Sequence, residues 1–374
     1  MTNITLIILA AFLFSALCGL IFIPLIIRFC RMRGLYDKPS PRKIHSHAVP
    51  RLGGISFLPT MLMALMVAMA VIHRTSEDGQ LTLSLWSVYF FISLTIVYCI
   101  GLVDDLFCVG ALTKFFFQIV AAVIIPMSGL YINNMYGFCG IHEVPLIVGG
   151  PFTVFLLVFA MNAINLIDGI DGLAGGLSFI ALAGFQICFY REELWPYCIL
   201  IAGLMGVVVA FLFFNVFGSA EHGNKIFMGD SGSLTLGFIL GFLLVKFSMH
   251  NPNVMPFRHD SLQLSYTLLI VPVFDVVRVS LLRLFHHRPI FDADKNHFHH
   301  KLMRAGLSQH MALIVILSLS LGYIVLNVVL SRWLFMSHIV VIDIILWLII
   351  HMIINHAIIL NKQPVFLIKK ANKG

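Results

Sequence analysis

Three short motifs of this chain place carboxylates beside glycine or a strongly apolar run. The first, GLVDDLF at 101–107, carries Asp104 and Asp105 at the end of an apolar segment. Carboxylates at a membrane boundary are costly, so two adjacent ones indicate a task such as holding a cation or a proton. The plain alternative is a solvated helix end.

The second motif, NLIDGIDGLAGG at 165–176, repeats an oxygen-bearing side chain every third residue. Asn165, Asp168 and Asp171 stand among four glycines, which let other groups approach the backbone closely. Such a set at a helix end suits a hard cation, or a phosphate with its Mg²⁺. A turn with a helix cap is the alternative, and the spacing and closing Glu of a calcium loop are missing.

The third motif, FMGDSGSLTLG at 227–237, places Asp230 just before a Ser/Gly turn that opens an apolar segment. The free amides of a helix N-terminus bind anions. Asp230 beside them is placed to hold a metal that bridges phosphate oxygens. A plain N-cap by Ser231 or Ser233 is the alternative.

A fourth segment, 288–306, combines imidazole and guanidinium groups. Its polar members are Arg288, Asp294, His297, His299, His300 and Arg304. A zinc site is the competing interpretation, but no thiolate or closing carboxylate supports it. Arginine binds two phosphate oxygens at once, so phosphate is the better match. The basic segment 37–56, which ends in PRLGGIS, adds cations and a flexible backbone that we expect to run beside a bound anion.

The elements that position these motifs are apolar. Of the 374 residues, 60% are hydrophobic and 11% are charged, and the mean hydropathy is +0.98. A soluble domain carries about 25% charged residues, so this composition excludes a soluble enzyme, a disordered chain and a disulfide-stapled secreted domain. We therefore expect an all-α polytopic membrane protein in which 1–374 form a single transmembrane domain.

Eleven apolar runs approach the length of about 20 residues that a transmembrane helix needs. They cover residues 4–27, 53–73, 84–103, 114–132, 146–166, 173–190, 194–215, 231–248, 263–284, 311–330 and 336–360. Of the 24 lysine and arginine residues, 18 fall on the side of the first loop and four on the other. The positive-inside rule then places the N-terminus in the periplasm and the C-terminus in the cytoplasm. All the motifs converge on the cytoplasmic face.

As a set, VDD at 103–105, NLIDGIDGLAGG, KIFMGDSGSL at 225–234 and HFHH at 297–300 resemble the signature of the polyprenyl-phosphate N-acetylhexosamine-1-phosphate transferases, glycosyltransferase family 4. HFHH and eleven spans are similar to the branch that loads N-acetylglucosamine 1-phosphate onto undecaprenyl phosphate. Its usual form is HIHH, so Phe298 is a mild departure. The phospho-N-acetylmuramoyl-pentapeptide transferases carry three consecutive histidines and usually ten spans, and their donor is the alternative.

The resemblance implies a role for each motif. Asp230 with Asn165 would hold Mg²⁺, with Mn²⁺ as a substitute, and Asp104 and Asp105 would serve the lipid phosphate, with Asp104 as the base. The resemblance assigns the remaining residues to phosphate, nucleotide and sugar contacts, namely Lys114, Asp168, Asp171, Phe227, Arg288, Asp294, His297, His299 and His300. The implied partners are a UDP-N-acetylhexosamine, undecaprenyl phosphate, the bacterial inner-membrane bilayer and a second copy of the chain, but no nucleic acid.

In the implied reaction, an oxygen of polyprenyl phosphate attacks the sugar-bearing phosphorus and UMP leaves. The second pKa of a phosphate monoester is about 6, so the nucleophile is already ionised at neutral pH. This favours direct displacement over an aspartyl-phosphate intermediate. The rival of another class, an ion-coupled transporter, would place its carboxylates near the bilayer midplane. A non-catalytic lipid-diphosphate binder is a third reading.

Overall fold

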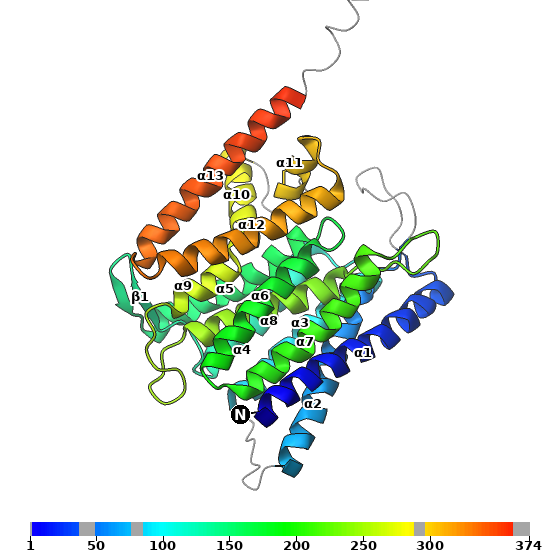
Figure 1. The fold of residues 1–374 in the computed structure, drawn as a ribbon, viewed down its shortest axis with the longest axis horizontal. Helices are drawn as coiled ribbons and strands as arrows, with labels where there is room; N and C mark the ends of the chain where they lie inside the picture. Colours follow the sequence, from blue (N-terminus) through cyan, green and yellow to red (C-terminus); the bar gives the residue numbers. More distant parts are fainter. Residues whose placement is uncertain (1, 37–48, 76–84, 288–295, 362–374) are drawn as a thin grey trace, which may run out of the picture.

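The computed structural model describes residues 2–36, 49–75, 85–287 and 296–361, and it is almost entirely helical (Figure 1). The helices are α1 (Thr2–Arg33), η1 (Gly53–Ser56), α2 (Phe57–Thr75), α3 (Leu85–Phe107), α4 (Ala111–Met127), α5 (Leu146–Ile167), α6 (Leu173–Arg191), α7 (Trp195–Val216), α8 (Gly229–Ser248), α9 (Ser261–Leu268), α10 (Ile270–Phe285), α11 (Phe298–Arg304), α12 (Gln309–Leu330) and α13 (Met336–Asn361). Two strands, β1 (Asn134–Phe138) and β2 (Ile141–Glu143), lie between α4 and α5.

Within the described ranges, nine helices are long and apolar enough to cross a membrane. The prediction of an all-α polytopic membrane protein is therefore confirmed. The predicted spans 114–132 and 263–284 correspond to α4, which has 17 residues, and to the pair α9 and α10. The count of eleven spans stays a prediction.

The ninth predicted span is interrupted at Leu269, which separates α9 from α10. Pro272 explains the interruption, because proline has no N–H and its ring collides with the carbonyl four residues earlier in a continuous helix. In the first turn of α10 the missing N–H costs nothing. The break gives α10 its own start, and α10 carries the charged residues Asp275 and Arg278.

The strands β1 and β2 form an antiparallel hairpin, a small departure from the all-helical expectation. Phe138 pairs with Ile141 across a two-residue loop in which Cys139 and Gly140 both have positive φ, 53° and 78°. This is the geometry of the two-residue turns that match strand twist. The Cys139 N–H donates to Ser337 at the start of α13, 2.9 Å away. In Figure 1 β1 and the start of α13 lie toward one end of the helix bundle, and α11 and the end of α13 lie toward the other.

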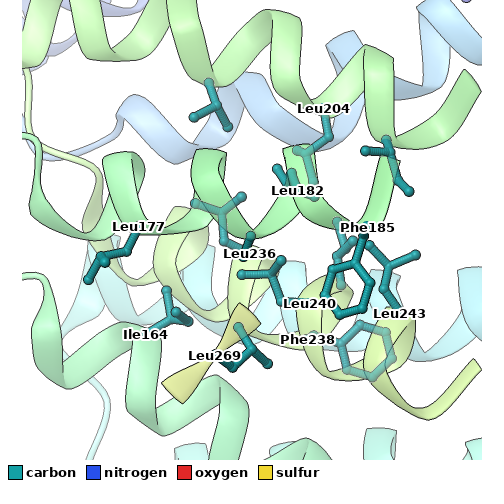
Figure 2. Packing of buried hydrophobic residues seen from close by; sticks show 14 of the residues in the cluster. Ile164, Leu177, Leu182, Phe185, Leu204, Leu236, Phe238, Leu240, Leu243 and Leu269 are labelled. Carbon is teal, nitrogen blue, oxygen red and sulfur yellow. The ribbon is translucent and has the colours of Figure 1, made fainter. Parts of the chain in front are cut away.

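Helix α8 forms the centre of the bundle. Its apolar window is 100% buried, against 28% for α1 and α13. It packs against α3, α5, α6 and α9. Figure 2 shows Leu236, Leu240 and Leu243 of α8 among Leu182 and Phe185 of α6. A helix enclosed in this way is apolar on all sides, and its first turn is then held at a fixed place in the interior.

The first turn of α8 lies against backbone from two other segments. A Cβ on Gly54 would lie 2.1 Å from the Cα of Gly232, so only glycine permits this approach of η1 to α8. Gly229 has a φ of +75°, and a Cβ there would lie 2.6 Å from a carboxylate oxygen of Asp105. Left-handed backbone of this kind strains other residues. Gly54 and Gly229 therefore allow η1 and the end of α3 to pack directly against the first turn of α8.

Candidate active site

A lysine from α4 joins carboxylates from two other helices. The Nζ of Lys114 lies 3.2 Å from Oδ2 of Asp104 and 2.5 Å from Oδ2 of Asp230. Asp104 lies near the end of α3, and Asp230 is the second residue of α8. The lysine side chain is 22% exposed and that of Asp230 is 24% exposed, so ligands can reach this cluster. Lysine has three N–H donors, and one is left for a third acceptor.

Asp105 faces a different partner from its neighbour Asp104. Its two carboxylate oxygens accept hydrogen bonds from the backbone N–H groups of Asp230, at 2.8 Å, and Ser231, at 2.9 Å. The side chain is only 1% exposed. A carboxylate at a helix N-terminus satisfies otherwise unpaired amides and the positive end of the helix dipole. Asp105 therefore ties the end of α3 to the start of α8.

Arg51 closes the same junction from the other side. Its guanidinium donates to the backbone carbonyls of Asp104, at 3.1 Å, and Asp105, at 3.0 Å. These carbonyls belong to the last turn of α3, where helix C-termini lack internal partners. The adjacent backbone pairs with the third motif, because Gly53 donates to the carbonyl of Phe227 at 2.9 Å. The described part of the basic segment 37–56 thus supports the site through the Arg51 side chain and through the backbone of Gly53.

The second motif contributes Asn165 and Asp168 at the end of α5. The Asn165 side-chain amide donates to Ser233 of α8, 2.8 Å away. Asp168 is solvent-exposed, but many protein atoms surround it. This desolvation, together with the negative charges of Asp230, Asp171 and Asp105, raises the pKa of Asp168 to about 7. Carboxylates that repel one another in this way favour a bound cation.

Asp171 is held by a second lysine, because its Oδ2 lies 2.7 Å from the Nζ of Lys225. The loop around it is fixed by Asn215 of α7, which accepts from the Gly172 N–H at 2.6 Å and donates to the Ile226 carbonyl at 2.9 Å. Asn215 thus joins the second and third motifs. Phe227 follows Ile226 and is half-buried.

His299 of α11 lies against the second motif. A Cβ on Gly169 would lie 2.4 Å from Nε2 of His299, so the imidazole packs directly on the glycine. Burial, together with the charges of His300 and His297, lowers the pKa of His299 to about 3. The rings of His297 and His299 are nearly parallel, with centroids 6.1 Å apart.

His297 is itself anchored to α10. Its Nδ1 lies 2.9 Å from Oδ2 of Asp275, a carboxylate with no solvent exposure. Arg278, one helical turn further on, lies 3.1 Å from the other oxygen of Asp275.

Sequence reasoning missed Asp275 and Asn215. The available signals were a carboxylate within the apolar run 263–284, with Arg278 three residues later, and an isolated amide in the run 194–215. Intramembrane polar residues of this kind mark sites by default.

An apolar groove of about 440 Å³ ends at the Lys114 cluster. Lys114 and Asn165 lie among its lining residues, and the rest of the lining is mostly apolar side chains of α4, α5 and α10. Phe155 in this lining is 59% exposed, so the groove opens on the outer surface of the bundle, where lipid chains would lie. The groove thus connects the membrane-facing surface with the charged cluster.

Arg288 and Asp294, like residues 37–48, lie outside the described residues. The other candidates belong to one connected region, in which Lys114 joins Asp104 to Asp230 and His299 packs on Gly169. In the ranges that the structure describes, no three His, Cys, Asp or Glu residues form a group that could hold a metal, and His297 Nδ1 is bound to Asp275. The zinc interpretation therefore gains no support.

Comparison with known proteins agrees with this arrangement. The family described as "Glycosyl transferase family 4" matches residues 85–248, which carry the first three motifs. A probable undecaprenyl-phosphate N-acetylglucosaminyl 1-phosphate transferase of Bacillus subtilis is 32% identical over 321 residues, which cover 83% of this chain and 81% of the relative. The chain belongs to glycosyl transferase family 4.

Two further members of the family are similar over most of their length. The undecaprenyl-phosphate alpha-N-acetylglucosaminyl 1-phosphate transferases of Yersinia pestis and Escherichia coli K12 are each 27% identical over 288 residues, covering 76% of this chain and 73% of each relative. The resemblance inferred from the motifs, to the family and to this branch of it, is confirmed. As a family 4 glycosyl transferase, the chain is a multi-pass membrane phosphoglycosyl transferase.

Proposed function

We propose that this protein transfers N-acetylglucosamine 1-phosphate from UDP-N-acetylglucosamine to undecaprenyl phosphate and releases UMP. The relatives named above carry this activity in their names. Because they belong to the N-acetylglucosamine branch, the muramoyl-pentapeptide donor is not favoured.

The observation that carries the proposal is the position of Lys114. It lies where an apolar groove from the bundle surface meets carboxylates from α3 and α8. A polyprenyl chain in the groove would bring its phosphate to the Lys114 ammonium, and a donor from the aqueous side would meet it there. A cytoplasmic nucleotide-sugar and a lipid acceptor can therefore react at one place.

In the direct displacement we propose, an oxygen of the lipid phosphate forms a bond to the sugar-bearing phosphorus. The bond from that phosphorus to the bridging oxygen breaks, and UMP leaves with the electron pair. Lys114 binds and orients the lipid phosphate, and Asp104, hydrogen-bonded to that lysine, accepts a proton from any monoanion that enters. Asp105 keeps Asp230 in place through the start of α8. The work of these residues is positioning and charge balance, as in other phosphoryl transfers.

The residues also fit a magnesium ion. Desolvation and the repulsion of neighbouring carboxylates raise the pKa of Asp168, and a cation at the site would relieve the repulsion. Asp230 and Asn165 offer the oxygen ligands that Mg²⁺ prefers, and this ion keeps several waters, so few protein ligands suffice. When bound, Mg²⁺ would neutralise charge on the donor diphosphate. Mn²⁺ is proposed as a substitute.

The remaining candidates are assigned to the donor. Asp171 and Asp168 border the nucleotide side, and half-buried Phe227 offers a ring for uracil. His297, His299 and His300 contact the diphosphate and sugar from α11 and the residue before it. Arg288 and Asp294, outside the described residues, are proposed to act with them.

The orientation follows from charge. With 18 of 24 basic residues on the side of the first loop, the active site faces the cytoplasm, the N-terminus the periplasm and the bilayer is the bacterial inner membrane. A homodimer is proposed from the family resemblance. The transporter alternative is not favoured, because Asp168 directly follows α5 and Asp230 is the second residue of α8, so both lie at helix ends.

The test uses purified protein in detergent with undecaprenyl phosphate, Mg²⁺ and a panel of UDP-sugars, and it measures UMP release. Release with UDP-N-acetylglucosamine alone, abolished in Asp230→Ala, is the expected result. Release with another UDP-sugar would overturn the donor, and no release from folded protein would overturn the reaction.

Direct displacement has its own test. Asp104→Asn should retain measurable turnover at raised pH, where the lipid phosphate is fully ionised. Complete loss at every pH, with trapping of a sugar-phosphorylated enzyme, would establish the aspartyl-phosphate route instead.

A further inference from the structure

Helix α10 carries a carboxylate that the reaction as described above does not use. Asp275 has no solvent exposure, and it lies in a helix of a membrane protein. Buried charges are retained only where they are paired, and intramembrane ones commonly serve function.

The contacts of Asp275 that the structure shows are with the start of α11 and with Arg278, which binds the residue before HFHH. Oδ2 lies 2.9 Å from Nδ1 of His297, and Oδ1 accepts from the backbone N–H of Phe298 at 2.9 Å. Arg278 lies 3.1 Å from Oδ1 and also donates to the carbonyl of Asn296. Asn296, which precedes the HFHH segment, and the first two residues of that segment are thus bound to α10.

A second helix holds the same segment from the other side. The ring of Phe298, 1% exposed, lies 5.0 Å from the ring of Trp347 and 5.1 Å from that of His351, both on α13. With Phe298 held by α13 and its backbone by α10, α11 has little freedom to shift. The contact of His299 with Gly169 is fixed by the same anchorage.

The bond to Asp275 also decides the chemistry of His297. The hydrogen bond that one ring nitrogen makes sets the protonation of the other. Because Nδ1 is engaged by a carboxylate, Nε2 is the nitrogen left for a ligand.

We propose that Asp275 is a positioning residue for the donor: it holds His297 through Nδ1 and the Phe298 backbone so that Nε2 of His297 contacts the donor. The inference rests on the proposed function. It assigns a role in donor binding to a residue of α10 that does not itself touch the donor.

The first test is Asp275→Asn, in which the remaining amide oxygen can still accept from Phe298. Loss of one charge-assisted hydrogen bond should raise the KM for the UDP-sugar about tenfold and leave the KM for undecaprenyl phosphate unchanged. In a His297→Gln background the same substitution should change the donor KM less than about twofold, because the bond it removes is already absent. An equal rise in both backgrounds, or no rise in either, would overturn the inference.

The isosteres of His297 keep the inference testable if Asp275→Asn does not fold. Asparagine places its amide near Nδ1 and keeps the bond to Asp275, whereas glutamine places its amide near Nε2. We expect His297→Asn to keep the thermal stability of the wild type and lose donor affinity, and His297→Gln, which has no bond to Asp275, to lose both. Wild-type donor KM in His297→Asn would refute the role of Nε2.

Asp343 provides the matched control. It is another carboxylate with no exposure, on α13, and its partners are Tyr266 and Asn327. Asp343→Asn should leave the donor KM unchanged, and a rise equal to that of Asp275→Asn would show that any buried carboxylate has this effect.

The Kd of UDP-N-acetylglucosamine without acceptor separates the two failures. No binding to the wild type would refute the proposed function, whereas wild-type Kd in Asp275→Asn would refute only the role of Asp275.

Discussion

Asp104 and Asp105 are adjacent and both buried, yet they have different partners in the structure. Asp104 contacts the ammonium of Lys114, and Asp105 accepts two hydrogen bonds from the first turn of α8. Replacing each with alanine in turn removes the same group from consecutive positions. We expect Asp105→Ala to act chiefly on stability and Asp104→Ala chiefly on turnover.

The size of the stability effect follows from the contacts that are lost. The Asp105 carboxylate is 1% exposed, so water cannot replace it at the start of α8. Two hydrogen bonds to a charged acceptor contribute at least about 1.5 kcal/mol each, or about 3 kcal/mol together. For a chain of this size that corresponds to a fall in Tm of about 4 °C. Asp104→Ala removes an ion pair at the mouth of the site and should lower Tm by less than about 2 °C.

The assay is the Tm of each purified variant in one detergent, read beside UMP release at saturating substrates. Asp105→Asn serves as the control, because its amide oxygen can keep one of the two hydrogen bonds and should recover part of both Tm and turnover. Asp104→Asn should recover no stability, since little was lost.

Two results would refute this reasoning. A Tm for Asp105→Ala within about 1 °C of the wild type would mean that the bonds to α8 contribute nothing measurable. A larger fall for Asp104→Ala than for Asp105→Ala would mean that the assignment of the two carboxylates is reversed.

Three further predictions concern Lys114, Gly169 and His299. Lys114→Met should lower UMP release by at least about 100-fold, because two carboxylates and the lipid phosphate lose their cation; near-wild-type release would contradict this. Gly169→Ala places a Cβ 2.4 Å from His299, so kcat/KM should fall about tenfold, and unchanged kcat/KM would show that His299 can move aside. Burial lowers the pKa of His299 to about 3 in the folded protein. Between pH 3 and pH 6.5 only the unfolded chain binds this proton, so His299 lowers the stability of the fold as the pH decreases. Between pH 7 and pH 5 the wild type should lose about 2 kcal/mol more stability than His299→Phe, measured by Tm of the two proteins.

Much of the fold was predictable because hydropathy is a local property. Each of the eleven apolar runs is mostly helical in the structure, including 263–284, where the helix is interrupted at Leu269. The break itself had a signal in Pro272, but its position depends on how α9 and α10 pack. The hairpin of β1 and β2 was missed because its short strands alternate too little for a pattern to register.

The motifs predicted which residues gather at the site, because carboxylates, glycines and histidines beside apolar runs have few other uses there. They did not predict which partner each of these residues contacts. Asp104 and Asp105 look alike in GLVDDLF, and only the position of α8 gives one a lysine and the other a helix N-terminus.

The sequence by itself therefore determined the class of the protein, the helices, the candidate site residues of the motifs and the family. The tertiary structure decided the pairings: Asp105 with α8, Asp275 with His297, Asn215 with Gly172. The physical reason is the separation along the chain of the residues that interact. Burial and helix formation depend on the composition of neighbouring residues, whereas a hydrogen bond between α10 and the start of α11 depends on the packing of helices distant in the chain.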